Sequence, residues 1–168
     1  MSKKTKAQSA MEYLMTYGWA ILIIAVVLGA LFSLGVFSGT SFMGTVCIPS
    51  SGFVCTNPIL HNGQLTVTVG QATGTSWSSA TLCLIGSGVV PSTSCTSVAG
   101  ANVVISGGLA SGQTTQATFT SYVSSSSGGT SLPSAIGATF SGYIYAVYTV
   151  GSTSGLMTQM ATINAKAT

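Results

Sequence analysis

The sequence is almost without charge. Its 168 residues include no aspartate and no arginine, one glutamate (Glu12) and one histidine (His61). Paired-carboxylate catalysis needs two acidic side chains, and a Ser-His-acid triad would have to use Glu12, which lies in an apolar stretch. His61 could be paired with a cysteine nucleophile, but the cysteines are better used as disulfides. We therefore expect that the protein is not an enzyme, with no catalytic residues and no cofactor.

Basic side chains are equally scarce. Three of the four lysines precede the apolar stretch, which leaves Lys166 as the one cation in the rest of the chain. Nucleic-acid binding depends on neutralising phosphates with lysine and arginine, so we expect no nucleic-acid partner. The cysteine spacings are too wide for a C-x₂₋₄-C zinc motif, and there is a single histidine, so we expect no metal site.

What the sequence does have is one long apolar run, Met11–Phe37. It exceeds the roughly 20 residues that a helix needs to cross a bilayer. Tyr13, Tyr17 and Trp19 cluster near its start, as in an interfacial aromatic belt, and the three lysines just before them favour a cytoplasmic N-terminus. The run predicts a single-pass membrane helix with the C-terminal part of the chain outside the cell.

Small residues recur at every fourth position of this run, at Ala25, Gly29 and Ser33. They share one helix face and would let neighbouring helix backbones approach closely. The alternative is a plain membrane anchor in which small residues recur by chance. Glycines become frequent beyond the run and weaken a helix, so we predict a helix over 8–40 and an outer domain over 41–168.

Short β-like runs separated by Gly, Ser and Pro fill the outer domain. We predict strands at Gln64–Gly70, Ala80–Ile85, Ala101–Ser106, Thr114–Thr120, Phe140–Val150 and Leu156–Asn164. Asn62-Gly63 favours a hairpin turn, Ser124–Gly129 is interpreted as an exposed loop, and all four prolines (Pro49, Pro58, Pro91 and Pro133) are expected in turns. The predicted fold class is α+β: a long N-terminal hydrophobic helix followed by an antiparallel, Ig-like β-sandwich.

Four cysteines, Cys47, Cys55, Cys83 and Cys95, all follow the apolar run. An even number in a chain that looks exported favours two disulfides over reduced thiols in a cytosolic protein. Four cysteines allow three pairings, and we predict Cys47–Cys55 and Cys83–Cys95 because these partners are near in sequence with turn residues between them. Loops of this size would stabilise the fold by roughly 2–3 kcal/mol each.

The segment Lys6–Leu14 (KAQSAMEYL) resembles the class III signal peptide of archaeal type IV pilin precursors. In that family a membrane aspartic peptidase cuts between a small residue and a glutamine that is closely followed by serine and glutamate. The resemblance implies that residues 1–7 are a cleaved leader and that the cut lies between Ala7 and Gln8. Glu12 then becomes the fifth residue of the processed chain, where type IV pilins carry their glutamate.

The resemblance implies a structural subunit of an extracellular type IV pilus-like filament for surface attachment. Its partners would be further copies of the chain in a helical homopolymer, the membrane before assembly, a prepilin peptidase, and an assembly ATPase with its platform. Glu12 would attract the α-amino group of Gln8 on a neighbour, and Ala25, Gly29 and Ser33 would let the helices pack.

Two other functions remain open. The chain could be a monomeric cell-surface protein held by its N-terminal anchor, in which Glu12 is solvated at the membrane edge, or an archaellin-type motility filament subunit. In any of these settings the uncharged Ser/Thr-rich surface lacks the charges that usually protect sheet edges. We expect subunit packing or O-linked glycans to cover it; no Asn-x-Ser/Thr sequon is present.

Overall fold

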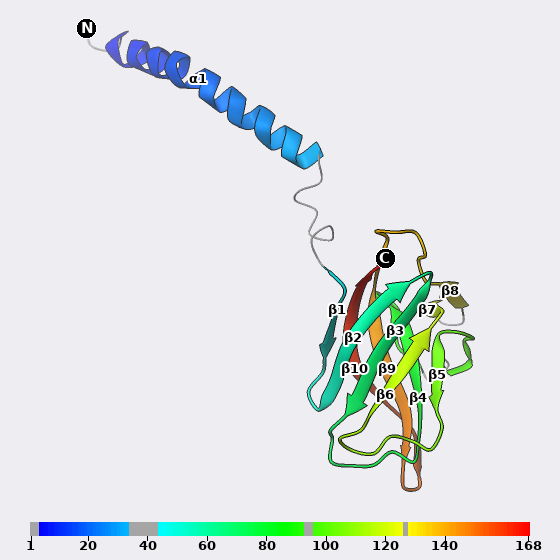
Figure 1. The fold of residues 1–168 in the computed structure, drawn as a ribbon. Coiled ribbons are helices and arrows are strands. Elements are labelled where there is room, and N and C mark those ends of the chain that lie inside the picture. Colours follow the sequence, from blue (N-terminus) through cyan, green and yellow to red (C-terminus); the bar gives the residue numbers. More distant parts are fainter. Residues whose placement is uncertain (1–3, 34–43, 93–95, 126–127) are drawn as a thin grey trace. The chain divides into compact units, whose positions relative to one another are not determined.

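The computed structural model describes residues 4–33, 44–92, 96–125 and 128–168 (Figure 1). The chain divides into two compact units, Met1–Phe42 and Met43–Thr168, and each is described by itself. The predicted boundary between residues 40 and 41 falls outside the described residues. An N-terminal hydrophobic helix followed by two mostly antiparallel β-sheets confirms the predicted α+β class.

The first unit contains one long helix, α1, over Lys4–Ser33. Its 30 residues correspond to a length of about 45 Å. Leucine, isoleucine, valine and alanine occupy successive positions from Ala20 to Leu28, so every face of this part of the helix is apolar. A helix of this kind needs apolar surroundings on all sides.

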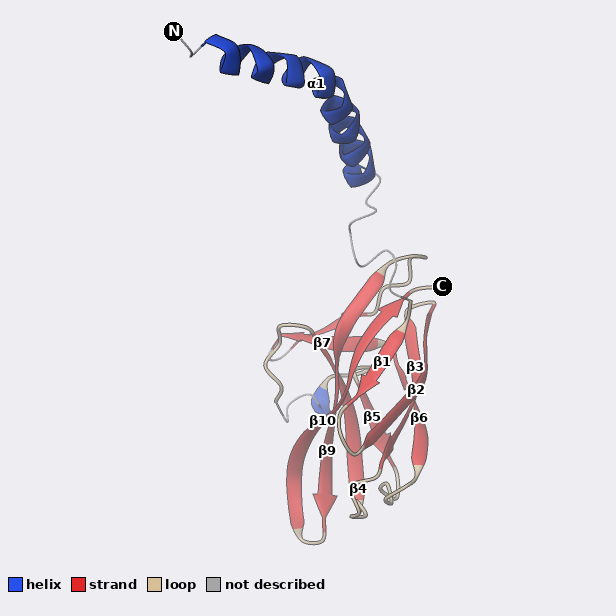
Figure 2. Ribbon diagram, turned by 90° about the vertical axis from the view of Figure 1, so that its left-hand side faces the viewer, coloured by secondary structure: helices blue, strands red, loops and turns tan. Residues whose placement is uncertain are grey.

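The second unit is built from two packed β-sheets, seen from the side in Figure 2. Its described strands are β1 (Val46–Pro49), β2 (Phe53–His61), β3 (Gln64–Gln71), β4 (Ser79–Gly86), β5 (Asn102–Ile105), β6 (Thr114–Phe119), β7 (Ser121–Ser125), β8 (Gly128–Ser131), β9 (Thr139–Val150) and β10 (Thr153–Lys166). The larger sheet has the order β1-β10-β9-β4-β7-β8, with β5 also paired to β4, and the smaller sheet has the order β2-β3-β6.

The main core lies between these two sheets. Leu65 and Val67 of β3 are fully buried against Leu84 of β4 and Ile144 of β9 within one cluster. Burial of a large aliphatic side chain stabilises a fold by about 1.5–3 kcal/mol. The alternation predicted for Gln64–Gly70 is therefore confirmed, because its apolar positions face the opposite sheet and its threonines face outward.

All six predicted strands are present as β3, β4, β5, β6, β9 and β10. Four strands were not predicted, namely β1, β2, β7 and β8. One strand pair also departs from a purely antiparallel arrangement, because β4 and β7 run parallel where Ile85 lies opposite Val123.

The interpretation of Ser124–Gly129 as a loop is wrong. Ser124 and Ser125 end β7, and Gly128 and Gly129 begin β8, with residues 126–127 outside the described part. The small residues serve close packing here: a Cβ atom on Gly129 would lie 2.6 Å from Cγ1 of Val98. The same composition that predicts a loop is thus required where a hairpin contacts a neighbouring segment.

The prediction that all four prolines lie in turns is wrong for two of them. Pro49 is the last residue of β1 and Pro58 lies within β2, whereas Pro91 and Pro133 lie outside the strands. β2 accepts Pro58 because it is an edge strand whose register shifts between Thr56 and Ile59.

The predicted Asn62-Gly63 turn is confirmed as the two-residue connection between β2 and β3. Both residues have positive φ, 48° and 71°. This is the geometry that a type I′ hairpin turn requires.

Candidate functional site

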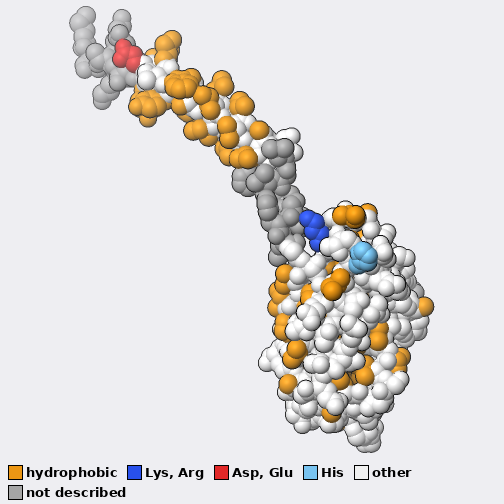
Figure 3. All heavy atoms as spheres, in the orientation of Figure 1, with side chains coloured by type: hydrophobic (Ala, Val, Ile, Leu, Met, Phe, Trp, Pro, Cys, Tyr) orange, Lys and Arg blue, Asp and Glu red, His pale blue; other side chains and the backbone are white. Residues whose placement is uncertain are grey.

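The exposed apolar surface of α1 is the principal candidate site. The segment Met15–Ser33 has 19 residues, is apolar enough to cross a membrane, and has no share buried within the chain. At 1.5 Å per residue its length is about 29 Å, close to the roughly 30 Å hydrocarbon thickness of a bilayer. Figure 3 shows apolar side chains over the described part of this helix. The helix has the size and chemistry to be surrounded by lipid or by other helices.

Exposed side chains on this segment are numerous and large. They are Met15, Tyr17, Trp19, Ile21, Leu22, Ile23, Ile24, Val26, Val27, Leu28 and Phe32. Burial of one such side chain stabilises a complex by about 1.5–3 kcal/mol relative to exposure to water. Covering the whole helix would therefore stabilise a complex strongly. The site is therefore an extended apolar surface.

Glu12 lies on α1 ahead of this segment, and its side chain is exposed. The hydroxyl of Thr16 donates a hydrogen bond to the backbone carbonyl oxygen of Glu12 at 2.8 Å. Next to it the rings of Tyr13 and Tyr17 pack with their centroids 4.5 Å apart. The helix backbone continues through Ala7 and Gln8, whose side chains are outside the described part, and the predicted cleavage between them stays a prediction.

The predicted small-residue face of α1 is exposed along its whole length. Ala25, Gly29 and Ser33 are all exposed, and, apart from the adjoining helix backbone, no described atom lies within 4 Å of the position that a Cβ on Gly29 would take. Nothing in the described part of the chain occupies this face. A close approach by another helix backbone is sterically open here.

A disulfide between Cys47 and Cys55 is confirmed in the second unit. Cys47 lies on β1 of the larger sheet and Cys55 on β2 of the smaller sheet, with their Cα atoms 5.9 Å apart. The bond therefore joins the two sheets at one edge of the sandwich. It also indicates an oxidising, extracytoplasmic environment, because disulfides are rare in the cytosol.

Cys83 is fully buried on β4 and is also disulfide-bonded. Its predicted partner, Cys95, lies outside the described residues. The Cys83–Cys95 pairing therefore stays a prediction.

Tyr145 marks a second buried region that the sequence analysis missed. It packs on the face of the larger sheet that points away from the smaller one, against a cluster that includes Cys83 and Ile85. Its hydroxyl donates to Oε1 of Gln159 at 3.2 Å. Burial, together with the nearby Tyr143, raises the pKa of Tyr145 above its ordinary value. The segment Tyr143–Tyr148 (YIYAVY) has apolar or aromatic side chains at every position. Both faces of this strand are therefore apolar, and this pattern could have indicated a second buried face.

Charge is nearly absent from the second unit. Lys166 is its one charged residue, and Nδ1 of His61 lies 2.7 Å from the carbonyl oxygen of Thr168. Within the part of the chain that the structure describes, no group of three or more His, Cys, Asp or Glu side chains could hold a metal ion.

Comparisons with protein-family models, with curated proteins and with solved structures find no match for this chain. The architecture of the chain is therefore the guide to its function. That architecture is an exposed, membrane-length apolar helix followed by a disulfide-linked β-sandwich, and it is consistent with a pilin-like subunit.

Proposed function

We infer that the chain is a structural subunit of an extracellular type IV pilus-like filament used for surface attachment, assembled through α1. The observation that carries this proposal is the separation of roles between the two units. The core clusters of the described residues lie wholly in the second unit and contain no residue of α1. The helix is therefore unnecessary for folding the β-sandwich, and its apolar surface is left for other molecules.

The distribution of apolar residues favours complete enclosure of α1. A helix that lies flat on a membrane has one strongly polar face. Between Ala20 and Leu28 the helix has no polar side chain at all. Lipid encloses such a helix before assembly, and the helices of neighbouring subunits enclose it in the core of a filament.

Glu12 supports assembly through a specific partner. A carboxylate in an apolar helix costs several kcal/mol unless it is paired. In our proposal a prepilin peptidase cuts between Ala7 and Gln8 and creates an α-amino group one helical turn from Glu12. Attraction of Glu12 to that amine on a neighbour sets the axial register, and Ala25, Gly29 and Ser33 allow the helices to pack.

An assembly ATPase and its membrane platform would supply the work of moving subunits from lipid into the filament. On the outside, subunit packing or O-linked glycans would cover the uncharged Ser/Thr-rich surface of the sandwich. The mass of intact filaments tests the glycan part: a mass equal to the bare polypeptide would remove it.

The central experiment is Glu12→Gln, which keeps the side-chain size and removes the charge. Lys166→Gln is the matched control, because it removes the one charge of the second unit. We expect Glu12→Gln to reach the membrane but to give few or no filaments, and Lys166→Gln to assemble normally. A normal filament yield from Glu12→Gln would show that Glu12 has no role in assembly. Membrane retention of the wild-type chain without any filament would favour the monomeric anchor.

Processing is tested separately by mass spectrometry of material sheared from the cell surface. We expect an N-terminal peptide that begins at Gln8. Recovery of Met1–Ala7 still attached to filaments would contradict the cleavage.

A further inference from the structure

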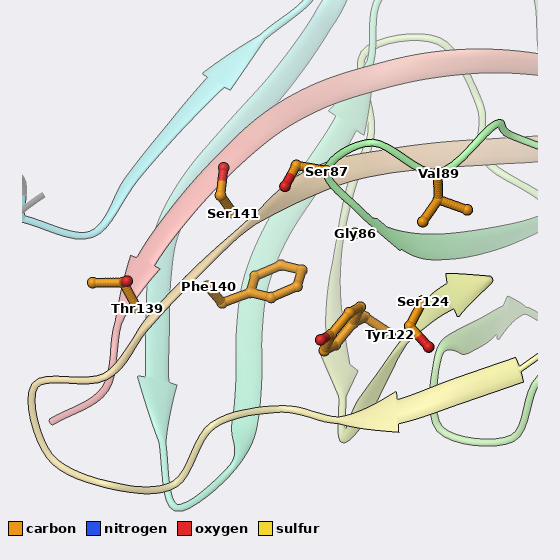
Figure 4. A pocket seen from close by; sticks show the side chains of 8 residues that line it. All are labelled: Gly86, Ser87, Val89, Tyr122, Ser124, Thr139, Phe140 and Ser141. Atoms are coloured by element: carbon orange, nitrogen blue, oxygen red, sulfur yellow. The ribbon is translucent and has the colours of Figure 1, made fainter.

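A hollow of about 400 Å³ opens at one end of the sandwich, where β4 stops (Figure 4). In the larger sheet β4 lies between β9 and β7, and its last residue, Gly86, pairs with Gly142 of β9. Beyond this point β9 and β7 continue without a strand between them. The hollow is lined by Gly86, Ser87, Val89, Tyr122, Ser124, Thr139, Phe140 and Ser141.

Two aromatic rings at the hollow occupy space that glycines leave free. The rings of Tyr122 and Phe140 lie with their centroids 4.9 Å apart. A Cβ atom on Gly86 would come within 2.9 Å of the Tyr122 ring, and one on Gly142 within 2.7 Å of the Phe140 ring. The rings therefore occupy space that any larger residue at these positions would fill. Phe140 is buried, whereas Tyr122 keeps part of its surface exposed to the hollow.

Several residues that line the hollow carry hydroxyl groups. Ser87, Thr139 and Ser141 are exposed at the hollow, and among the described residues their hydroxyls take part in no hydrogen bond, nor does that of Tyr122. The hydroxyl of Ser124, in contrast, accepts a hydrogen bond from Thr130 at 2.7 Å. Four hydroxyls that can each donate and accept are thus available among the residues that line the hollow.

We propose that this hollow binds one ring of a neutral sugar. Its volume falls within the range of about 300–1,000 Å³ that is typical of small-molecule sites. None of the described residues that line it is charged, and Lys166, which pairs with Thr139 at its edge, is not among them. A pyranose ring presents C–H groups that pack on an aromatic face and hydroxyls that exchange hydrogen bonds with serine, threonine and tyrosine. The inference uses the second unit alone and does not depend on filament assembly.

Binding is measured on the full chain, produced without glycosylation and held in a detergent that has no sugar head group. The probes are the methyl glycosides of glucose, galactose, mannose and N-acetylglucosamine, followed by saturation-transfer NMR and calorimetry. We expect at least one probe to bind and to transfer saturation from aromatic protons. Absence of binding by all four at about 10 mM, where a complex with a Kd near 1 mM is mostly formed, would overturn the proposal.

Variants then locate the site. Tyr122→Phe keeps the ring and its packing but removes the hydroxyl, and Tyr143→Phe is the matched control on the same sheet, outside the residues that line the hollow. We expect Tyr122→Phe and Ser141→Ala each to weaken binding by about three- to tenfold, the worth of one neutral hydrogen bond.

Tyr143→Phe should bind like the wild type. Ser141→Phe should block the hollow and abolish binding, while circular dichroism confirms that each variant is folded. Unchanged affinity in all three hollow variants would place any sugar binding elsewhere and overturn the assignment. Binding of an extended peptide in place of every glycoside would overturn it as well.

Discussion

The segment Met15–Ser33 of α1 has no charged residue and the second unit has one, Lys166, yet the two treat apolar surface in opposite ways. In α1 the segment Met15–Ser33 buries none of its side chains within the chain. In the second unit the apolar side chains of both sheets meet in a shared core, and Leu65, Leu84 and Ile144 are fully buried. Low charge alone therefore does not decide where apolar side chains lie: the second unit buries many of them in its core, whereas Met15–Ser33 leaves them exposed.

Equivalent residues in the two units make this contrast testable. Leu84 of β4 is completely buried, whereas Leu28 of α1 is 44% exposed. Val104 of β5 and Val26 of α1 have similar exposure, 68% and 63%. If the same substitution has different effects on the two members of a pair, the difference reflects the surroundings of each side chain.

The largest effect is expected from Leu84→Ala, which leaves a cavity between the sheets. We expect the free energy of unfolding of the second unit to fall by about 2–5 kcal/mol. Leu28→Ala, the matched substitution in α1, should leave that unfolding transition unchanged. Thermal and denaturant unfolding of the full chain in detergent measure both, and equal losses would show that α1 belongs to the fold of the sandwich.

Val26→Lys compares the surroundings of two exposed valines. A lysine at the centre of a membrane-spanning helix costs about 2.5–3.5 kcal/mol, so we expect loss of membrane retention and of filaments. Val104→Lys changes an exposed residue of the sandwich and should alter stability by no more than about 0.5 kcal/mol. Cell fractionation and electron microscopy give the readout. Normal filaments from Val26→Lys would contradict enclosure of α1.

Loss of the Cys47–Cys55 disulfide should lower the free energy of unfolding by less than the largest loss expected from Leu84→Ala. Replacing both cysteines by serine opens a short loop between the two sheets, and we expect a loss of roughly 2–3 kcal/mol in the free energy of unfolding. The native chain under reducing conditions should show a loss at least as large. Non-reducing peptide mapping also checks the predicted Cys83–Cys95 link; a peptide joining Cys47 to Cys83 or Cys95 would contradict the pairing.

The smallest effect is expected from Tyr145 at high pH. Its pKa is raised in the folded chain, mainly by burial, so the folded state holds this proton more tightly than the unfolded state does. The resulting stabilisation is fully present below the unfolded pKa of about 10 and is lost as the pH rises through the higher folded pKa. Tyr145→Phe should therefore show a shallower decline of Tm above that pH than the wild type. Identical profiles would contradict the assignment.

The sequence by itself determined the features that rest on neighbouring residues. The apolar run Met11–Phe37 is long enough to predict α1, because about 20 predominantly apolar residues in a row form a helix of membrane-spanning length. The alternation in Gln64–Gly70 predicts β3 and its buried face, and Asn62-Gly63 predicts the turn before it. The Cys47–Cys55 pair follows from a short spacing with turn residues between.

Only the tertiary structure decided the features that join distant segments. Ser124–Gly129 has the composition of a loop, yet pairing and close contact with Val98 make parts of it strand. The parallel pairing of β4 with β7 comes from the order in which strands complete the larger sheet. The hollow at Gly86 and the partly buried position of Tyr145 exist because strands far apart in the sequence end, or lie, beside each other. Local propensity carries no record of such contacts, since the packing of two whole sheets selects them.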